Sequence, residues 1–214
     1  MPRTTSRPLE PRKRPVQARS TVTVEAIFNA TLQVLVTHGR NLTTTRVAAR
    51  AGVSVGTMYQ YFPNKQALLH AVIGRYLGEV ADAVEAGCEA AQGSPFAAAS
   101  DTLVASYIAA KSRDADASRA LYAASSDLEV TSLVQNTFGR LKAAAVGLLN
   151  SCPDARFADT DQVAFTLLAA ITGATRVAFE NDADRRSLDG FRQDMMRVAR
   201  SFLITARTDA PPRG

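Results

Sequence analysis

Apolar residues recur at spacings of three and four along most of the chain, and this pattern limits the fold more than any other feature. The first such pattern predicts a helix that contains Val24, Ile27, Phe28, Leu32, Leu35 and Val36. We expect this helix to end at Gly39. No segment shows sustained alternation of apolar and polar residues, so we expect no strands. Helix breaks are expected at Gly93-Ser94-Pro95, at Cys152-Pro153-Asp154 and near Asp189-Gly190. The sequence therefore predicts an all-α fold.

Charge is unevenly distributed along the chain. Residues 1–65 carry 10 basic and 2 acidic side chains, whereas residues 66–214 carry 15 basic and 18 acidic ones. Residues 1–16 are rich in proline and arginine and cannot bury enough apolar area to order themselves, so we interpret them as a flexible basic arm. A cationic front part indicates a polyanionic partner. The alternative is that these basic residues only keep the chain soluble.

Residues able to carry catalysis or hold a metal are few and scattered. Cys88 and Cys152 form neither a metal-type nor a redox-type pair, and His38 and His70 lack a metal-binding spacing. No G-x-S-x-G, P-loop or dinucleotide fingerprint is present. We expect no enzyme, no metal and no cofactor, with a catalytic site assembled from distant residues as the alternative. We also expect no membrane-spanning stretch and a cytoplasmic location.

Two short helices are predicted after Gly39. Thr43 or Thr44 can cap the first, which ends at Gly52. Ser54 can cap the second, which runs over residues 55–62 because Pro63 stops it. Asn64 then caps a long helix that begins at Lys65. Two short helices joined by a glycine-containing turn of about three residues form a helix-turn-helix unit.

The helix over residues 55–62 is unusual because its exposed side carries almost no charge. Met58 and Phe62 are four residues apart, so we expect them to pack inward together with Val53. The outward positions are expected to be Thr57, Gln60 and Tyr61, with Tyr59 at the edge. Such hydrogen-bonding groups can hold a helix against phosphate oxygens while other atoms reach base edges.

Other groups around this helix favour a nucleic-acid partner. Gly56 lacks a side chain and permits close approach of another molecule. The helix N-terminus at Ser54 offers unpaired N–H groups to a phosphate. Lys65 is predicted to clamp a phosphate, and Arg46 and Arg50 supply further positive charge.

The segment "TTTRVAARAGVSVGTMYQYFPNKQALL" resembles the DNA-binding domain of TetR-type transcriptional regulators, and the resemblance extends over residues 17–80. It implies phosphate contacts by Thr44, Thr57, Tyr59, Tyr61 and Lys65. It implies base-edge contacts by Thr45, Val55, Gly56 and Gln60. The chain departs from the family pattern at Tyr61, where histidine is frequent, and at Val55, where a basic or polar residue is frequent. Val55 can still contact a thymine methyl group.

Two helices near the end are predicted to form a homodimer interface. Residues 160–181 are apolar nearly all round, which indicates one face against the same subunit and another against a partner. The expected interface residues are Phe165, Leu168, Ala169, Thr172, Phe191, Met195, Val198 and Phe202. Paired with their symmetry mates, the two helices would form a four-helix interface. The alternative is that residues 160–181 form the central core helix of a monomer.

The resemblance also implies that the helices between residues 95 and 151 enclose a pocket for a small-molecule inducer. The candidate pocket residues are Tyr107, Tyr122, Phe138, Leu141, Phe165 and Arg176. The few charges on these apolar faces favour an uncharged or aromatic ligand.

These predictions combine into one architecture and one function. We expect a basic arm over residues 1–16, a three-helix helix-turn-helix domain over 17–80 that ends in the long fourth helix, a helical regulatory and dimerisation domain over 81–207, and a disordered tail over 208–214. The expected function is a repressor that binds a near-palindromic double-stranded DNA operator and leaves it when the inducer binds. An activator of the same fold and a sequence-neutral architectural DNA-binding protein are the alternatives.

Overall fold

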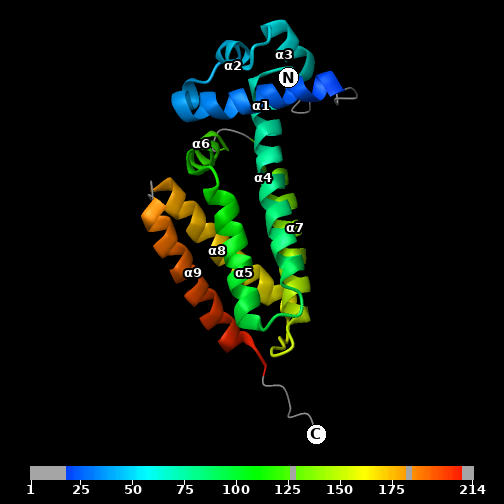
Figure 1. Ribbon diagram of the computed structural model, residues 1–214, viewed down its shortest axis with the longest axis vertical. Helices are drawn as coiled ribbons and strands as arrows, with labels where there is room; N and C mark the ends of the chain where they lie inside the picture. Colours follow the sequence, from blue (N-terminus) through cyan, green and yellow to red (C-terminus); the bar gives the residue numbers. More distant parts are fainter. Residues whose placement is uncertain (1–17, 126–128, 182–184, 209–214) are drawn as a thin grey trace, which may run out of the picture. The chain divides into compact units, whose positions relative to one another are not determined.

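The computed structural model describes residues 18–125, 129–181 and 185–208. In this part of the chain the elements are α1 Ala18–His38, the 3-10 turn η1 Gly39–Asn41, α2 Thr44–Ala51, α3 Val55–Tyr61, α4 Lys65–Ala90, α5 Phe96–Ser112, α6 Ala115–Ser125, α7 Thr131–Ser151, α8 Thr160–Glu180 and α9 Arg185–Ala206 (Figure 1). The described residues contain no strand, only an isolated bridge between Phe157 and Arg207. The predicted all-α fold is confirmed. The predicted basic arm lies outside the described residues, as does the predicted tail after Thr208.

The chain divides into two compact units. The first contains α1 to α3, α4 as far as Tyr76, α6 and the start of α7. The second contains the rest of α4 and α7 together with α5, α8 and α9. The assignment of α6 to the first unit was not anticipated from the sequence.

The first unit has a core built where α1, α2 and α3 pack together (Figure 1). Ile27 of α1, Val47 of α2 and Met58 of α3 are almost completely buried in it. The Phe28 and Phe62 rings lie 5.7 Å apart between centroids, which joins α1 to the end of α3. Burial of these side chains against α1 stabilises α2 and α3, which have 8 and 7 residues and would be unstable alone, since helices under about 12 residues are marginal in water.

Local signals set the helix ends in the first unit. Gly39 and Gly52 have φ angles of 52° and 68°, which are left-handed values that favour glycine, and they follow the last residues of α1 and α2. The Asn64 side chain accepts a hydrogen bond from the Ala67 N–H at 2.8 Å and so caps α4. The predicted helix ends and caps at these positions are confirmed.

In the second unit, α9 packs against both α5 and α8 (Figure 1). Leu103, Ile171 and Leu203 are among the fully buried side chains of this core. Arg200 of α9 pairs with Asp101 of α5 at its edge. Because the helices of this unit pack against one another, its long alanine-rich segments bury their apolar faces between helices.

The break predicted near Asp189-Gly190 is misplaced, because α9 begins at Arg185 and continues through both residues. Leu188 and Met195 are buried on either side of Gly190 and hold the adjoining turns. A glycine inside a helix costs only about 1 kcal/mol relative to alanine, which packing of this kind outweighs.

The expectation that no apolar stretch reaches membrane-spanning length is also corrected. Helix α8 is long and apolar enough to cross a membrane by length and composition alone. One such helix is weak evidence for a membrane, because core and interface helices of other proteins pass the same test.

Two helical glycines should respond oppositely to alanine. A Cβ added at Gly87 of α4 would lie 2.9 Å from the Cβ of Ser106, whereas one added at Gly139 of α7 would meet nothing within 4 Å. We expect Gly139→Ala to raise the free energy of unfolding by roughly 0.5–1 kcal/mol through helix propensity. Gly87→Ala should lower it by about 1–3 kcal/mol through overpacking. Urea denaturation measures both. If Gly87→Ala instead raised the free energy of unfolding, α5 would have to move away from the added methyl group without losing packing energy.

Candidate nucleic-acid interface

Each of the two short helices, α2 and α3, begins at a capping side chain. Thr43 Oγ1 accepts a hydrogen bond from the Arg46 N–H at 3.3 Å, which begins α2. Ser54 Oγ accepts one from the Thr57 N–H at 2.9 Å, which begins α3. Ser54 Oγ and Thr57 Oγ1 also share a hydrogen bond at 2.8 Å. Of the two residues predicted as possible caps of α2, Thr43 is the one that caps it, and the predicted Ser54 cap of α3 is confirmed.

The two sides of α3 differ in exposure. Met58 is 1% exposed and Phe62 is 2% exposed, so the predicted inward packing is confirmed. Tyr59 is 41% exposed. Of the other predicted interface residues, the exposed ones are Thr45, Arg46, Ser54, Gly56 and Gln60, and the half-buried ones are Thr44, Val55, Thr57, Tyr61 and Lys65. An uncharged, hydrogen-bonding surface therefore covers the outer side of α3.

A hydrogen bond that the sequence did not reveal joins the two short helices. Thr44 Oγ1 and Tyr59 Oη share it at 3.2 Å, across an exposed surface. This contact positions the phenol beside the N-terminus of α2. Two predicted phosphate-contacting side chains are thereby held next to each other before any partner binds.

Three of the cations around α2 and α3 are held by neutral acceptors. Arg46 donates to the Asn41 carbonyl oxygen at 2.8 Å, and Arg50 donates to Gln33 Oε1 at 2.7 Å. Lys65 Nζ donates to the Arg40 carbonyl oxygen at 3.3 Å. Because these acceptors carry no charge, each contact orients a cation without neutralising it. The surface around α2 and α3 keeps its positive charge for a polyanion.

The predicted pocket residues occupy different environments. Tyr122 belongs to the first unit and the other five to the second. Tyr107 and Leu141 are buried in the core, and Arg176 forms an exposed ion pair with Glu180 at 2.7 Å. The Phe138 and Phe165 rings meet edge to face with centroids 5.6 Å apart.

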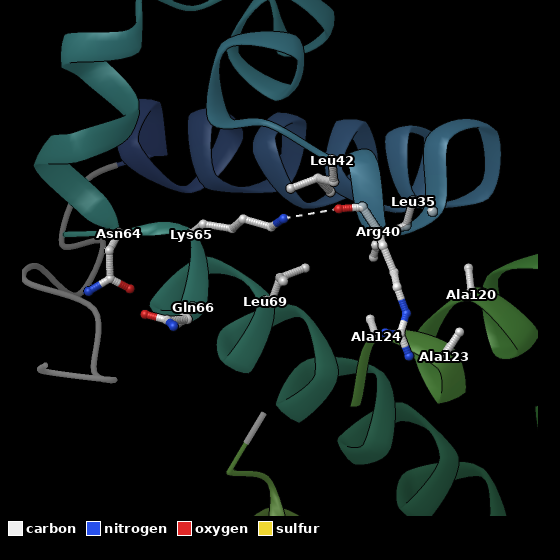
Figure 2. Close-up of a pocket in the computed structure, with 11 residues that line it drawn as sticks. Leu35, Arg40, Leu42, Asn64, Lys65, Gln66, Leu69, Ala120, Ala123 and Ala124 are labelled. Carbon is white, nitrogen blue, oxygen red and sulfur yellow. Dashed lines mark hydrogen bonds between the residues drawn. The ribbon is translucent and has the colours of Figure 1, made fainter. Parts of the chain in front are cut away.

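A pocket of about 360 Å³ lies elsewhere, in the first unit (Figure 2). None of the six candidate pocket residues lines it. Its lining comes from the end of α1, from η1, from the start of α4 and from α6. Sequence reasoning missed it because α6 is distant from the other elements in the sequence.

The predicted dimer residues also separate by exposure. Phe165, Ala169 and Val198 are exposed, and Thr172, Phe191 and Phe202 are half-buried. Leu168 and Met195 are instead buried within their own subunit. Two exposed apolar residues that the sequence analysis did not select, Val177 and Ile204, lie on the same two helices. Helices α8 and α9 thus carry exposed apolar side chains in addition to their buried sides.

Lys111 is a further residue that the sequence analysis missed. It lies on α5 and is 3% exposed, and desolvation lowers the pKa of its ammonium to about 7. Its position four residues after Tyr107, on the apolar side of a helix, was the available signal. Burial also raises the pKa of the Cys88 thiol to about 11, so this cysteine has little thiolate for nucleophilic chemistry.

An exposed helix of neutral hydrogen-bonding residues, held on capped short helices and flanked by cations, defines a helix-turn-helix DNA-binding protein with a C-terminal helical domain. Residues 27–72 match the family of bacterial regulatory proteins called tetR, and residues 95–203 match the tetracyclin repressor-like C-terminal domain. The chain belongs to the TetR family of transcriptional regulators. A comparison with curated proteins found no match.

Solved structures share this fold. A TetR transcription regulator from Haloarcula marismortui has a TM-score of 0.69 at 21% identity, covering 88% of this chain and 100% of that one. A TetR-family regulator from Streptomyces coelicolor has a TM-score of 0.60 at 25% identity, with coverages of 86% and 99%. The fatty acid degradation regulator FadR from Bacillus halodurans has a TM-score of 0.63 at 16% identity, with coverages of 82% and 96%.

Proposed function

We propose that this TetR-family regulator is a cytoplasmic homodimeric repressor, which binds a near-palindromic operator and leaves it when a small molecule binds. The observation that carries the proposal is the exposed, neutral, hydrogen-bonding side of α3, with Tyr59 joined to Thr44 at 3.2 Å. This side is suited to a DNA groove because its donors can reach phosphates while its small side chains permit close approach.

Within the DNA complex, the residues divide into two groups. Thr44, Thr57, Tyr59, Tyr61 and Lys65 contact phosphates and fix the position of α3. Thr45, Val55, Gly56 and Gln60 contact base edges and read the sequence. Arg46 adds positive charge, and Ser54 presents the N-terminus of α3. Phosphate contacts supply most of the affinity, whereas base contacts discriminate between sequences.

The second part of the proposal is a twofold dimer formed through α8 and α9. Phe165, Val177, Val198 and Ile204 support it, because each is about half exposed despite being large and apolar. In such a dimer, two α3 helices about 34 Å apart would enter successive major grooves on one side of the duplex. A near-palindromic operator follows from that twofold symmetry.

The third part is release by a ligand held in the second unit, near Tyr107, Phe138 and Leu141. The ligand changes DNA affinity only by the difference between its affinities for the DNA-binding and the released arrangements. A dimer bound to an operator that overlaps a promoter blocks the polymerase. We therefore expect the protein to repress transcription. Activation would require the operator to lie upstream of the promoter.

Substitutions on α3 and α4 should separate affinity from sequence preference. Tyr59→Phe and Lys65→Ala are expected to weaken binding to all duplexes alike, and Lys65→Ala should lower the salt slope by about 1. Gln60→Ala should change the preferred base at one position per half-site, with discrimination reduced by about 1–3 kcal/mol. Titration of operator and scrambled duplexes at several salt concentrations measures each effect. Parental affinity in both Tyr59→Phe and Lys65→Ala would contradict the phosphate assignments.

The experiment that tests the proposal directly is selection of bound fragments from the organism's own genomic DNA. We expect a few fragments sharing an inverted repeat, and a reporter behind such a fragment should be silenced by the protein. Bound fragments without any common sequence would instead support the architectural alternative. A reporter that rises in activity would support an activator.

A further inference from the structure

The pocket in the first unit has a mixed lining that nothing in the proposed function uses. Figure 2 shows it between the end of α1, η1, the start of α4 and α6. Leu35, Leu42 and Leu69 form an apolar side, and alanines of α6 form another. Its volume of about 360 Å³ falls within the range of pockets that hold small molecules, roughly 300–1,000 Å³.

Two cations give this pocket its charge. The Arg40 side chain extends from η1 toward Ala123 and Ala124 of α6 (Figure 2). Lys65 Nζ lies against the Arg40 carbonyl oxygen at 3.3 Å, and an ammonium has three N–H groups to offer. The described residues that line the pocket include no acidic side chain. An anion entering it therefore meets two cations and an apolar wall.

We propose that this pocket binds a small amphipathic monoanion, such as a carboxylate on a compact apolar body. The carboxylate lies between the Arg40 guanidinium and the Lys65 ammonium, where charge-assisted hydrogen bonds are strong. The apolar body contacts Leu69 and the α6 alanines, where its transfer from water is favourable. Alanines leave room on the α6 side that larger residues would fill. This site is separate from the ligand site proposed in the second unit.

Occupation of the pocket has a consequence for DNA, and this part rests on the proposed function. Lys65 is a proposed phosphate contact, and η1 leads directly into α2, which carries Thr44 and Thr45. An anion bound to Lys65 competes with the operator phosphate for the same ammonium. The bound anion also reduces the positive charge beside α2, so DNA affinity falls and the salt slope becomes shallower.

A pair of matched probes tests the site without DNA. The probes are 1-naphthaleneacetate and its neutral analogue 1-naphthaleneacetamide. The chain contains no tryptophan, so naphthalene fluorescence can be followed directly in the full-length protein. We expect the carboxylate to bind about ten-fold more tightly than the amide, because hydrogen bonds to charged groups are worth more than neutral ones. Equal affinity of the two probes would overturn the proposed charge recognition.

Variants locate the binding site. Arg40→Gln should lower the affinity for the carboxylate about ten-fold and leave that for the amide unchanged, whereas Arg40→Lys should retain most of it. Ala124→Leu should weaken both probes by filling the α6 side. The control is Ala143→Leu on an exposed part of α7, which should bind both probes as the parent does. Thermal unfolding followed by circular dichroism confirms that each variant is folded. Parental binding by folded Arg40→Gln and Ala124→Leu proteins would overturn the proposed site.

Measurements of duplex binding in the presence of the probe separate a failure of this inference from a failure of the proposed function. Saturating 1-naphthaleneacetate should weaken duplex binding by the parent about ten-fold and by Arg40→Gln much less. A parent that binds the probe in this pocket yet keeps its DNA affinity would overturn the coupling, while the site itself stands. If the parent protein binds no duplex even without the probe, the proposed function is contradicted. The probe titrations without DNA still test the pocket in that case.

Discussion

A Val198→Glu variant is expected to be monomeric and to bind operator DNA at least about 100-fold more weakly than the parent. Val198 lies on α9 and is 52% exposed in the subunit. In the proposed dimer it becomes buried, and twofold symmetry places a glutamate on each subunit in the interface. A buried carboxylate without a partner costs several kcal/mol, so the dimer dissociates. Each subunit then holds one half-site, and the gain from binding both at once is lost.

The control for this variant is Val134→Glu. Val134 lies on α7 and is 50% exposed, so the substitution places the same charge at an equally exposed valine outside α8 and α9. We expect this variant to stay dimeric with parental DNA affinity. Sedimentation velocity gives the oligomeric state, and a fluorescence anisotropy titration gives the affinity. If Val134→Glu were monomeric and Val198→Glu remained dimeric, the interface would lie on α7 and not on α9.

A Lys111→Met variant is expected to be more stable than the parent, by an amount that depends on pH. Burial lowers the pKa of Lys111 from an ordinary 10.5 to about 7. Below pH 7 the ammonium is charged in both folded and unfolded chains, and the whole cost of burying it is present. Between pH 7 and about 10.5 the unfolded chain binds a proton that the folded chain does not, so the parent gains stability as pH rises.

The difference between variant and parent should therefore be greatest at low pH. We expect a free energy of unfolding higher by an order of 4 kcal/mol at pH 6, falling to roughly half at pH 9. Methionine fills a similar volume and removes the charge together with the N–H donors of the ammonium. The control is Lys142→Met, whose parent side chain is partly exposed and paired with Asp161. We expect no such pH trend for it. Guanidinium denaturation at each pH measures the effect, and a destabilised Lys111→Met would show that the charged amine has a favourable role in the core.

The helix-turn-helix unit could be predicted in detail because its signals are local. Thr43, Ser54 and Asn64 cap helices through bonds to residues three positions away. Gly52 ends α2 because its backbone adopts a left-handed conformation that other residues avoid. The spacing of Met58 and Phe62 settles which side of α3 is buried. None of these effects requires knowledge of distant parts of the chain.

Predictions for the C-terminal half were less precise because its helices are apolar on more than one side. In α8, the sequence could not separate Phe165, which is exposed, from Leu168, which is buried. A hydrophobic pattern shows where apolar residues lie but not which neighbour covers them. The same reason explains Met195, which was expected at a dimer interface and lies in the core of its own subunit.

The sequence alone determined the all-α fold, the ends and caps of the short helices, and the family of DNA-binding regulators to which the chain belongs. These properties depend on backbone preferences and side-chain spacing within a few residues. Only the tertiary structure decided the Thr44–Tyr59 hydrogen bond, the burial of Lys111 and the pocket beside Arg40 and Lys65. Each of these joins elements that are separated in sequence or depends on what packs around one side chain, and local patterns carry no information about such contacts.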